Sequence, residues 1–341
     1  MRRIVVRRPG GHEALELVEE PEPRPGRGEV RVRVRAVGIN YADVIVRLGH
    51  YEAAKGLYPL TPGFEFSGTV DALGAEAERF REGDRVFGFI RFGAYASSIA
   101  LPERQLYPCP EGWDFPECAA FPAVFLTAYH ALFKVAKVEA GETILVHSAA
   151  GGVGTALVQL GRIADCKVVG VVGGAHKGAL CRELGAAHVI DRSSQDLWAE
   201  ARRHSPAGYD AIFDANGIHT LRPGFEQLAH GGRLVVYGFA DIIPRGKSKP
   251  GLGTLAWNYL KVPKFSPLEM TTTNRAVMGF NVVFLFHKLA LAEEGMRRML
   301  DWIRAGSIRR VPVTPFPFER VADAHRALES GSTQGKLVLT V

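Results

Sequence analysis

The stretch Thr143–Ala164, TILVHSAAGGVGTALVQLGRIA, decides the fold of this chain. An apolar run at Ile144–Val146 enters a turn of small residues, Ser148–Gly154, and an amphipathic helical pattern follows. A buried strand that leads through a glycine turn into a helix presents unpaired backbone N–H groups and the positive end of a helix dipole to an anion. We therefore expect Gly151, Gly152 and Gly154 to let the backbone approach a pyrophosphate and to let the helix pack close to the sheet, as in dinucleotide-binding folds.

The segment that follows favours NADPH over NADH. Glycine suits any tight turn, so the first turn alone is weak evidence for a dinucleotide. Lys167–Val172 predicts a second parallel strand, which ends where an NAD enzyme places Asp or Glu on the ribose 2′-hydroxyl. This chain has Gly173 and Lys177 there, and Arg192 follows a further strand at Ala187–Asp191. A missing carboxylate and added cations suit a 2′-phosphate, although either cation alone is also explained as a solvated surface charge.

Composition indicates an ordinary globular enzyme of two domains. A length of 341 residues exceeds what one hydrophobic core usually sustains, and the contents of 47% hydrophobic and 23% charged residues show no disordered bias. The net charge of +6 comes from dispersed basic residues without a run of five like charges, so we expect no nucleic-acid partner. No apolar stretch reaches the length of a membrane span, no signal peptide is evident, and the four cysteines show no CxxC pairing. We expect a cytoplasmic protein with reduced thiols and no integral membrane association.

The first third of the chain is rich in short strands. Glu29–Val37 alternates apolar residues with arginine and predicts a half-buried strand. Further strands are expected at Gly63–Val70, Asp84–Phe89 and Tyr95–Ala100, separated by Gly, Pro and Asp turns. This pattern favours a partly open β-barrel over a sheet with crossover helices.

From about Phe125 onward, strands alternate with helical patterns. The expected strands are Ile144–His147, Lys167–Val172, Ala187–Ile190, Ala211–Asp214, Arg233–Tyr237 and Ala276–Phe280. Strands alternating with helices predict a doubly wound parallel sheet of the Rossmann type, and hence an α/β fold class. A helix over Glu293–Ala305 and a final strand at Lys336–Val341 follow, and the strand is expected to return to the first domain.

Several motifs in collinear order resemble the medium-chain dehydrogenase/reductase superfamily, in its zinc-independent quinone oxidoreductase branch. They are Gly38–Asp43 (GINYAD), Pro62–Gly68 (PGFEFSG), Glu82–Val86 (EGDRV), Leu126–Tyr129 (LTAY), Ala149–Gly154 (AAGGVG) and Gly335–Leu337 (GKL). Tyr237–Asp241 (YGFAD), the insert Ile242–Pro267 and Asn274–Asn281 (NRAVMGFN) are similar to synaptic vesicle membrane protein VAT-1 homologues. The resemblance implies a GroES-like catalytic domain at 1–124 and 285–341, a Rossmann NADPH-binding domain at 125–284, and a homodimer joined through the last Rossmann strand.

The resemblance also predicts that the protein contains no metal. Zinc enzymes of the superfamily carry Cys where this chain has Asn40 and His where it has Phe64, and neither replacement can supply a thiolate or imidazole to a tetrahedral zinc. In the region of those enzymes' structural zinc lobe, the chain has only Cys109 and Cys118. Alcohol oxidation without a Lewis acid loses its main activating group. Reduction of a conjugated acceptor needs only hydrogen-bond donors and a proton for its delocalised charge.

Asn40 and Tyr51 are the catalytic candidates. The resemblance implies that Asn40 faces the nicotinamide and the acceptor, where its side-chain N–H holds the cofactor or the acceptor oxygen; the alternative is an Asn that caps a helix over Tyr41–Leu48. Tyr51 stands where related enoyl reductases carry a tyrosine proposed as proton donor, and a phenol with a pKa of about 10 remains protonated at neutral pH. Its alternative is an ordinary packed aromatic. Asp43 is expected to orient its neighbours rather than to act as a base.

The residues expected to bind the cofactor come from the glycine turn, the strand ends and the resemblance. They are Asn40, Thr127, Ala150, Gly151, Gly152, Val153, Gly173, Lys177, Arg192, Asn216, Gly238, Phe239, Phe280 and Lys336. Lys336 is expected to add a distal charge, with a plain surface lysine as the alternative. Gly246–Pro267 is expected to form a mobile loop or lid because of its Gly, Pro and Lys content.

Together these features predict an NADPH-dependent, zinc-independent reductase of the conjugated double bond of an enone, or of a quinone. An enoyl reductase acting on a CoA- or carrier-bound substrate is an alternative within enzymes. A nucleotide-binding regulatory or interaction protein with little catalysis is the alternative from another class. The small-molecule substrate itself cannot be named, because pocket walls in this superfamily come from variable loops.

Overall fold

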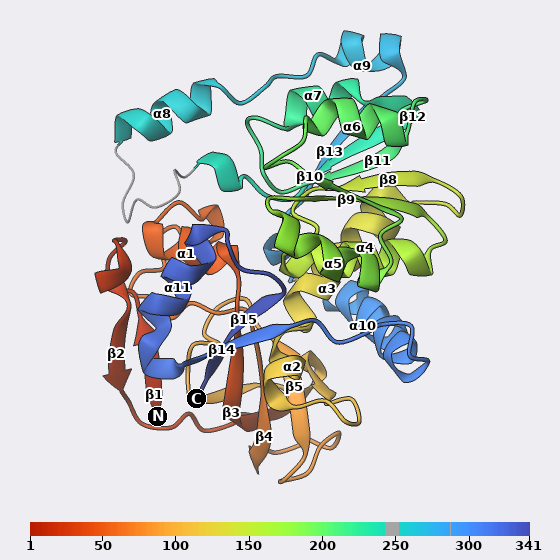
Figure 1. Cartoon of the computed structure of the whole chain (residues 1–341). Helices are drawn as coiled ribbons and strands as arrows, with labels where there is room; N and C mark the ends of the chain where they lie inside the picture. Colours follow the sequence, from red (N-terminus) through yellow and green to blue (C-terminus); the bar gives the residue numbers. More distant parts are fainter. Residues whose placement is uncertain (243–251, 287) are drawn as a thin grey trace. The chain divides into compact units, whose positions relative to one another are not determined.

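The middle of the chain folds around a six-stranded parallel sheet with the strand order β10-β9-β8-β11-β12-β13. The computed structural model describes residues 1–242, 252–286 and 288–341 (Figure 1). The strands of this sheet are β8 (Thr143–Val146), β9 (Lys167–Val172), β10 (His188–Asp191), β11 (Tyr209–Asp214), β12 (Leu228–Val236) and β13 (Ala276–Gly279). The strand order reverses between β8 and β11, the position where doubly wound sheets bind ligands. The doubly wound parallel sheet predicted from the sequence is confirmed.

Helices cover both faces of this sheet. They are α4 (Gly152–Ile163), α5 (Gly178–Leu184), α6 (Leu197–His204) and α7 (Leu221–Glu226), with α4 and α5 on one face and α6 and α7 on the other (Figure 1). α3 (Pro122–Tyr129) precedes the first strand, and α9 (Pro267–Thr273) precedes the last. Fully buried aliphatic side chains such as Leu145, Val169 and Ile212 fill the core between sheet and helices, as expected for strands covered on both faces.

The predicted loop Gly246–Pro267 is only partly within the described structure. Residues 246–251 lie outside the described residues. Leu252–Leu260 forms helix α8, so the loop prediction is wrong for this part. The segment LGTLAWNYL contains no proline, and the prolines that suggested a loop stand on either side of it at Pro250 and Pro263. A proline outside a helix ends it without disturbing its interior.

The chain divides into two compact units. Unit 1 comprises Met1–Val124, Val283–Arg304 and Arg310–Val341, and unit 2 comprises Phe125–Val282 and Ala305–Arg309. The sequence placed these divisions after residues 124 and 284. The predicted α/β class is confirmed, because unit 2 is built on the parallel sheet and unit 1 on a mostly antiparallel one.

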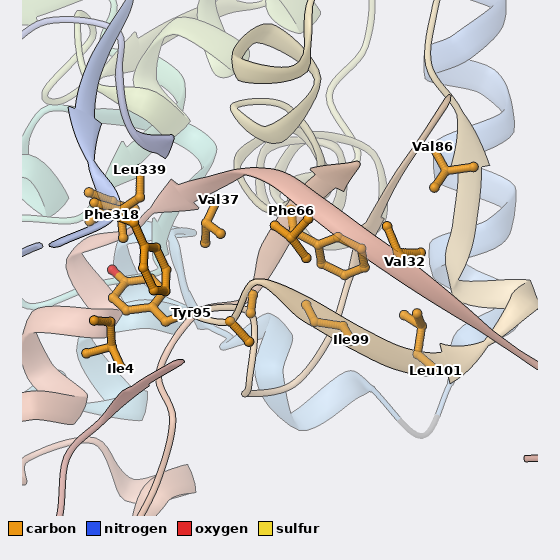
Figure 2. Packing of buried hydrophobic residues seen from close by; sticks show 14 of the residues in the cluster. Ile4, Val32, Val37, Phe66, Val86, Tyr95, Ile99, Leu101, Phe318 and Leu339 are labelled. Carbon is orange, nitrogen blue, oxygen red and sulfur yellow. The ribbon is translucent and has the colours of Figure 1, made fainter. Parts of the chain in front are cut away.

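Unit 1 is built on a seven-stranded sheet with the order β14-β15-β3-β4-β5-β7, in which β6 also pairs with β3. Its strands are β3 (Glu29–Ile39), β4 (Glu65–Leu73), β5 (Arg85–Phe89), β6 (Ser98–Pro102), β7 (Leu106–Pro108), β14 (Val313–Pro317) and β15 (Lys336–Thr340), and β1 (Arg2–Val5) pairs with β2 (Glu16–Glu19). The helices of the unit are α1 (Tyr41–Leu48), α2 (Phe115–Ala119), α10 (Leu289–Arg304) and α11 (Val321–Ser330). Figure 2 shows Val32, Phe66, Ile99 and Leu101 gathered in the buried core of this sheet.

The strand register of unit 1 determines which polar residues meet at the end of β3. β15 runs antiparallel to β3 with Leu337 opposite Ile39, which brings Lys336 level with Asn40. β4 runs antiparallel to the other side of β3 with Phe66 opposite Val37, which brings Glu65 level with Gly38. Three segments that are far apart in sequence therefore converge where β3 passes into α1.

One helical stretch has the length and composition of a membrane span. It covers Phe115–Ala136, and 67% of its most apolar window is buried inside the structure. A buried core helix meets the same length and composition test, so this stretch is weak evidence for a membrane. The expectation that no stretch reaches that length is nevertheless wrong for this segment.

Candidate functional site

The turn between β8 and α4 has the geometry of an anion cradle. A Cβ atom on Gly154 would lie 2.1 Å from the carbonyl oxygen of Ser148, so only glycine allows the helix to start this close to the strand. Gly151 is the N-cap residue and its N–H donates to Ser148 O at 2.9 Å. Because Gly151 has no side chain to cap the helix, the first-turn N–H groups of Gly152 and Val153 remain available to a ligand. Ala150, within the same turn, is buried.

The end of β9 brings Gly173 and Arg192 together. The Arg192 backbone N–H donates to Val172 O at 3.0 Å, and a Cβ atom on Gly173 would lie 3.8 Å from Arg192 Nε. Lys177, just before α5, is only 8% exposed. The alternative of a solvated surface charge is therefore wrong for Lys177, while Arg192 is half-buried beside the strand end where the ribose-reading carboxylate is missing.

The ends of β11, β12 and β13 complete this edge of the sheet. Asn216 is buried, and its Oδ1 accepts a hydrogen bond from Ser148 Oγ at 3.0 Å, which links the β11 end to the glycine turn. Gly238 follows β12, and Phe239 beside it is 41% exposed. The Phe280 ring follows β13, with its centroid 5.0 Å from that of His130.

Most of the predicted cofactor residues thus lie at the carboxyl edge of one sheet. Those that the structure brings to this edge are Ala150, Gly151, Gly152, Val153, Gly173, Arg192, Asn216, Gly238, Phe239 and Phe280. Thr127 lies in α3 of unit 2 and is half-buried. Asn40, Tyr51 and Lys336 belong to unit 1.

Sequence reasoning missed a buried pair at the same edge. His147 follows β8 and Asp214 ends β11, and both are fully buried with His147 Nε2 3.7 Å from Asp214 Oδ2. Burial lowers the pKa of His147, which favours the neutral imidazole. The other carboxylate oxygen, Asp214 Oδ1, accepts from the backbone N–H groups of Asn216 and Gly217 and so shapes the loop after β11. Strand-terminal polar residues at a switch point were the signal that could have identified the pair.

In unit 1, Asn40 belongs to a compact hydrogen-bonded cluster. Its Nδ2 donates to Glu65 Oε1 at 2.8 Å, and its Oδ1 accepts from Lys336 Nζ at 2.6 Å. Lys336 Nζ also lies 2.6 Å from Glu65 Oε1, and Glu65 Oε2 accepts from the Ala123 N–H at 2.7 Å. Glu65 and Lys336 are buried, whereas Asn40 is partly exposed. The sequence did not single out Glu65.

The position of Lys336 corrects both predictions made for it. The residue is only 3% exposed, so the surface alternative is wrong. Its ammonium donates to Ile39 O at 2.8 Å and to Asn40 Oδ1, and pairs with Glu65. An ammonium has three N–H donors, and these three acceptors occupy all of them. Lys336 therefore has no N–H donor left to bind a distal charged group of the cofactor. The pairing of β15 with β3 places its side chain in the protein interior.

Asp43 orients its neighbours, as expected. Asn40 is the N-cap residue of α1, and the Asn40 N–H donates to Asp43 Oδ2 at 2.8 Å. The Gly63 N–H donates to Asp43 Oδ1 at 2.8 Å, so one carboxyl group ties the α1 start to the segment before Glu65. Burial raises the pKa of Asp43 to about 7, although both N–H donors and Lys336 act in the opposite direction.

Tyr51 and Phe64 lie in an aromatic and apolar cluster of unit 1. The Tyr51 ring makes edge contacts with Phe64 and Phe92, at centroid distances of 6.0 Å and 6.4 Å. Phe64 is buried against Val46 and Ala54, among others. Within residues 1–242, 252–286 and 288–341, no three His, Cys, Asp or Glu side chains are grouped so as to hold a metal ion.

Comparison with known proteins finds relatives that are similar along almost the whole chain. The family model for the alcohol dehydrogenase GroES-like domain matches residues 26–111, and that for zinc-binding dehydrogenase matches residues 184–339. The human synaptic vesicle membrane protein VAT-1 homolog is 34% identical over 342 residues, covering 99% of this chain and 86% of the relative.

Two solved quinone oxidoreductases are also similar over their full length. That of Thermus thermophilus, solved alone and with NADPH, has 34% identity and a TM-score of 0.82, with 100% of both chains covered. That of Escherichia coli, solved with NADPH, has 26% identity and a TM-score of 0.86, again with 100% of both chains covered.

Proposed function

Because the chain belongs to the medium-chain dehydrogenase/reductase superfamily and is VAT-1-like within it, we propose that it is an NADPH-dependent, zinc-independent reductase of enones or quinones. The reaction would transfer hydride to the conjugated double bond of an enone or to a quinone. The single observation that carries the proposal is the cradle at Gly151–Gly154, where a Cβ on Gly154 would meet Ser148 O at 2.1 Å.

The cradle fits the pyrophosphate of a dinucleotide. The N–H groups of Gly152 and Val153 and the dipole of α4 would bind its negative charge. When bound, NADPH supplies a hydride from its nicotinamide ring. Phe280, Gly238 and Phe239 follow the last strands of the same edge and would position the rest of the cofactor.

A preference for NADPH is supported by the end of β9. The residues directly after Val172, Gly173–Lys177, include no Asp or Glu, and Arg192 lies beside Gly173, where a guanidinium would pair with a 2′-phosphate. The similar quinone oxidoreductases of Thermus thermophilus and Escherichia coli were both solved with NADPH.

The acceptor chemistry is inferred from Asn40 and Phe64. An amide and a phenyl ring replace the zinc-ligand types of the zinc enzymes, and Phe64 is packed among apolar side chains. Without a Lewis acid, the oxygen that gains charge during the reduction must be stabilised by hydrogen-bond donors, and Asn40 supplies an amide N–H. Tyr51 would donate the proton from its phenol, held at the edge of the Phe64 and Phe92 rings.

The test is NADPH consumption with a panel of duroquinone, 2-cyclohexenone and crotonyl-CoA, followed by product analysis with deuterated NADPH. For an enone we expect deuterium at the β-carbon, a solvent proton at the α-carbon and a retained carbonyl. Deuterium at the carbonyl carbon would refute double-bond reduction. Turnover of crotonyl-CoA alone would favour the carrier-bound alternative, and NADPH binding without turnover would favour a regulatory protein.

Tyr51→Phe separates proton donation from ring packing. The substitution keeps the aromatic contacts and removes the phenol, so kcat should fall while KM changes little. General-acid assistance is worth about 10²–10⁴ in rate. A loss of less than about threefold would mean that another group donates the proton.

A homodimer is also proposed, through the outer edge of β13. β13 is the terminal strand of the parallel sheet and pairs only with β12 among the strands that the structure describes. An edge strand with unpaired backbone groups is a template for pairing with a second copy. Light scattering after size-exclusion chromatography should give twice the chain mass, and a monomer at micromolar concentration would contradict the proposal.

A further inference from the structure

Asn40, Glu65 and Lys336 form a closed ring of hydrogen bonds. Lys336 Nζ contacts Asn40 Oδ1, Asn40 Nδ2 contacts Glu65 Oε1, and the same Glu65 oxygen contacts Lys336 Nζ. Every N–H of the Lys336 ammonium has an acceptor, and Glu65 accepts from three donors including the Ala123 N–H. The Lys336 ammonium thus uses all three of its N–H donors within the cluster, and Asn40 is the one of the three side chains that is partly exposed.

The two charges determine which way the carboxamide of Asn40 faces. Rotation by 180° about the Cβ–Cγ bond would place the NH₂ group against the ammonium and the carbonyl oxygen against the carboxylate. Both contacts would then be repulsive, so the chemistry of the neighbours assigns the amide orientation. Nδ2 keeps a second N–H outside the ring, whereas Oδ1 is held by a cationic donor. Asn40 is therefore presented to a ligand as a hydrogen-bond donor.

Room for this ring is provided by glycine. A Cβ atom on Gly38 would lie 2.5 Å from Glu65 Oε1 and 2.3 Å from Ala119 O. The absence of a side chain at Gly38 lets the carboxylate of Glu65 lie against β3, within reach of both Asn40 and Lys336. A buried ion pair is a costly means of stabilising a fold, since apolar pairs of similar volume do as well or better. The pair is more readily explained by what it does to Asn40.

We propose that Glu65 and Lys336 are positioning residues, which hold Asn40 so that its second Nδ2–H donates to the carbonyl oxygen of a quinone or enone acceptor. The inference rests on the proposed function and narrows its substrate class. An amide N–H held in place as a donor binds a carbonyl oxygen of the substrate better than a hydroxyl group that must itself donate. A donor fixed in advance costs no reorganisation when negative charge develops on that oxygen.

A double-mutant cycle on turnover tests the positioning role. Lys336→Met alone would leave Glu65 buried and unpaired, so Glu65→Gln and Lys336→Met are combined to remove both charges. Asn40→Ala should lower kcat with duroquinone by about 100-fold, and the charge-pair variant by about tenfold. Because the pair acts through Asn40, adding it to Asn40→Ala should cause no further loss. A combined loss of about 1,000-fold would overturn the positioning role.

A matched control removes a different ion pair, which lies in unit 2. Arg233 Nη2 and Glu142 Oε2 lie 2.8 Å apart and are also largely buried. On its own, the double substitution Arg233→Met with Glu142→Gln should not lower kcat tenfold. Combined with Asn40→Ala, it should leave the kcat loss caused by Asn40→Ala unchanged. An equal tenfold loss in this control would show that the effect is general destabilisation.

The orientation of the amide can be measured without turnover. The chain has five asparagines, so selective ¹⁵N-Asn labelling gives few side-chain NH₂ signals, and Asn40→Ala identifies that of Asn40. One Asn40 Nδ2–H should exchange slowly with solvent and the other quickly, and duroquinone with NADP⁺ should shift the fast one. In the charge-pair variant the slow proton should exchange markedly faster, because a glutamine carbonyl accepts more weakly than a carboxylate and the ammonium no longer holds Oδ1. Equal exchange in the wild type, or no shift with duroquinone, would overturn the inference.

These readouts separate the inference from the proposed function. If the wild type consumes no NADPH with any acceptor, the proposed function fails. Slow exchange of one Asn40 Nδ2–H, lost in the charge-pair variant, would still establish that Glu65 and Lys336 fix the amide. Turnover with normal kinetics in the charge-pair variant would refute the inference and leave the proposed function standing.

Discussion

Gly154→Ala is the most direct perturbation of the proposed cofactor cradle at Gly151–Gly154. The new Cβ would lie 2.1 Å from Ser148 O and 2.7 Å from Ala149 Cα. Carbon–oxygen contacts in proteins are closer to about 3.3 Å, so the atoms must separate by roughly 1 Å. Both neighbours are backbone atoms, and the relief must therefore move either the turn or the first turn of α4. Such a shift displaces the N–H groups of Gly152 and Val153 from their positions for an anion.

The magnitude follows from two opposing effects. Overpacking of this kind costs about 1–3 kcal/mol, whereas replacing a helical glycine with alanine favours the helix by roughly 1 kcal/mol. We expect a net loss of stability of up to about 2 kcal/mol, which corresponds to a fall in Tm of roughly 2–8 °C. The affinity for NADPH should fall at least tenfold, because the cradle loses its alignment.

Calorimetric titration with NADPH and thermal melting measure both effects. Gly224→Ala is the matched control, since Gly224 is also helical, lies in unit 2, and would place a Cβ atom 3.7 Å from its nearest neighbours. The control should bind NADPH as the wild type does and melt no lower. If Gly154→Ala also binds NADPH with unchanged affinity and melts at the wild-type temperature, the cradle argument is wrong.

Three further predictions concern the cofactor, the metal and pH. The wild type should bind NADPH at least about tenfold more tightly than NADH in fluorescence titrations. Lys177→Ala or Arg192→Ala should reduce that preference by about 1–2 kcal/mol. Equal affinities of the wild type for the two cofactors would contradict this prediction. Purified protein should contain no stoichiometric zinc by mass spectrometry, because Asn40 and Phe64 cannot ligate zinc. Chelators should leave activity unchanged. A measured content of one zinc per chain would refute this prediction. The folded-state pKa of Asp43, about 7, lies above its ordinary value of 3.8, so its protonation stabilises the fold at low pH, and this contribution is lost as pH rises through about 7. Asp43→Asn should remove up to roughly 4 kcal/mol of that pH dependence in urea unfolding, and an unchanged slope between pH 4 and pH 8 would oppose the assignment.

Local patterns were sufficient to predict the strand, turn and helix on which the proposed cofactor site of unit 2 rests. The strand, small-residue turn and amphipathic helix at Thr143–Ala164 form a contiguous unit whose geometry depends on its own glycines. The ends of the later strands could be located because parallel strands place their carboxyl ends at one edge. Helix α8 was missed because flanking prolines and glycines outweighed the apolar segment between them.

The cluster around Asn40 in unit 1 could be predicted only in part. Asn40 and Asp43 are neighbours in one motif, and the role of Asp43 as an orienting group followed from that motif. Glu65 and Lys336 carry no local signal that joins them to Asn40, since they are separated from it by 25 and 296 residues. Their meeting depends on the pairing of β3 with both β4 and β15.

The sequence by itself determined the α/β class, the doubly wound sheet and the glycine turn between β8 and α4, because these depend on periodicity and on backbone conformations that nearby residues dictate. Only the tertiary structure decided which polar side chains are buried and which partners they contact. Lys336, which the sequence assigned to cofactor binding or to the surface, is buried. It pairs with Glu65, which the sequence did not single out. The physical reason is that a side chain's burial and partners are set by strand register, and register arises from the packing of segments that are distant in the chain.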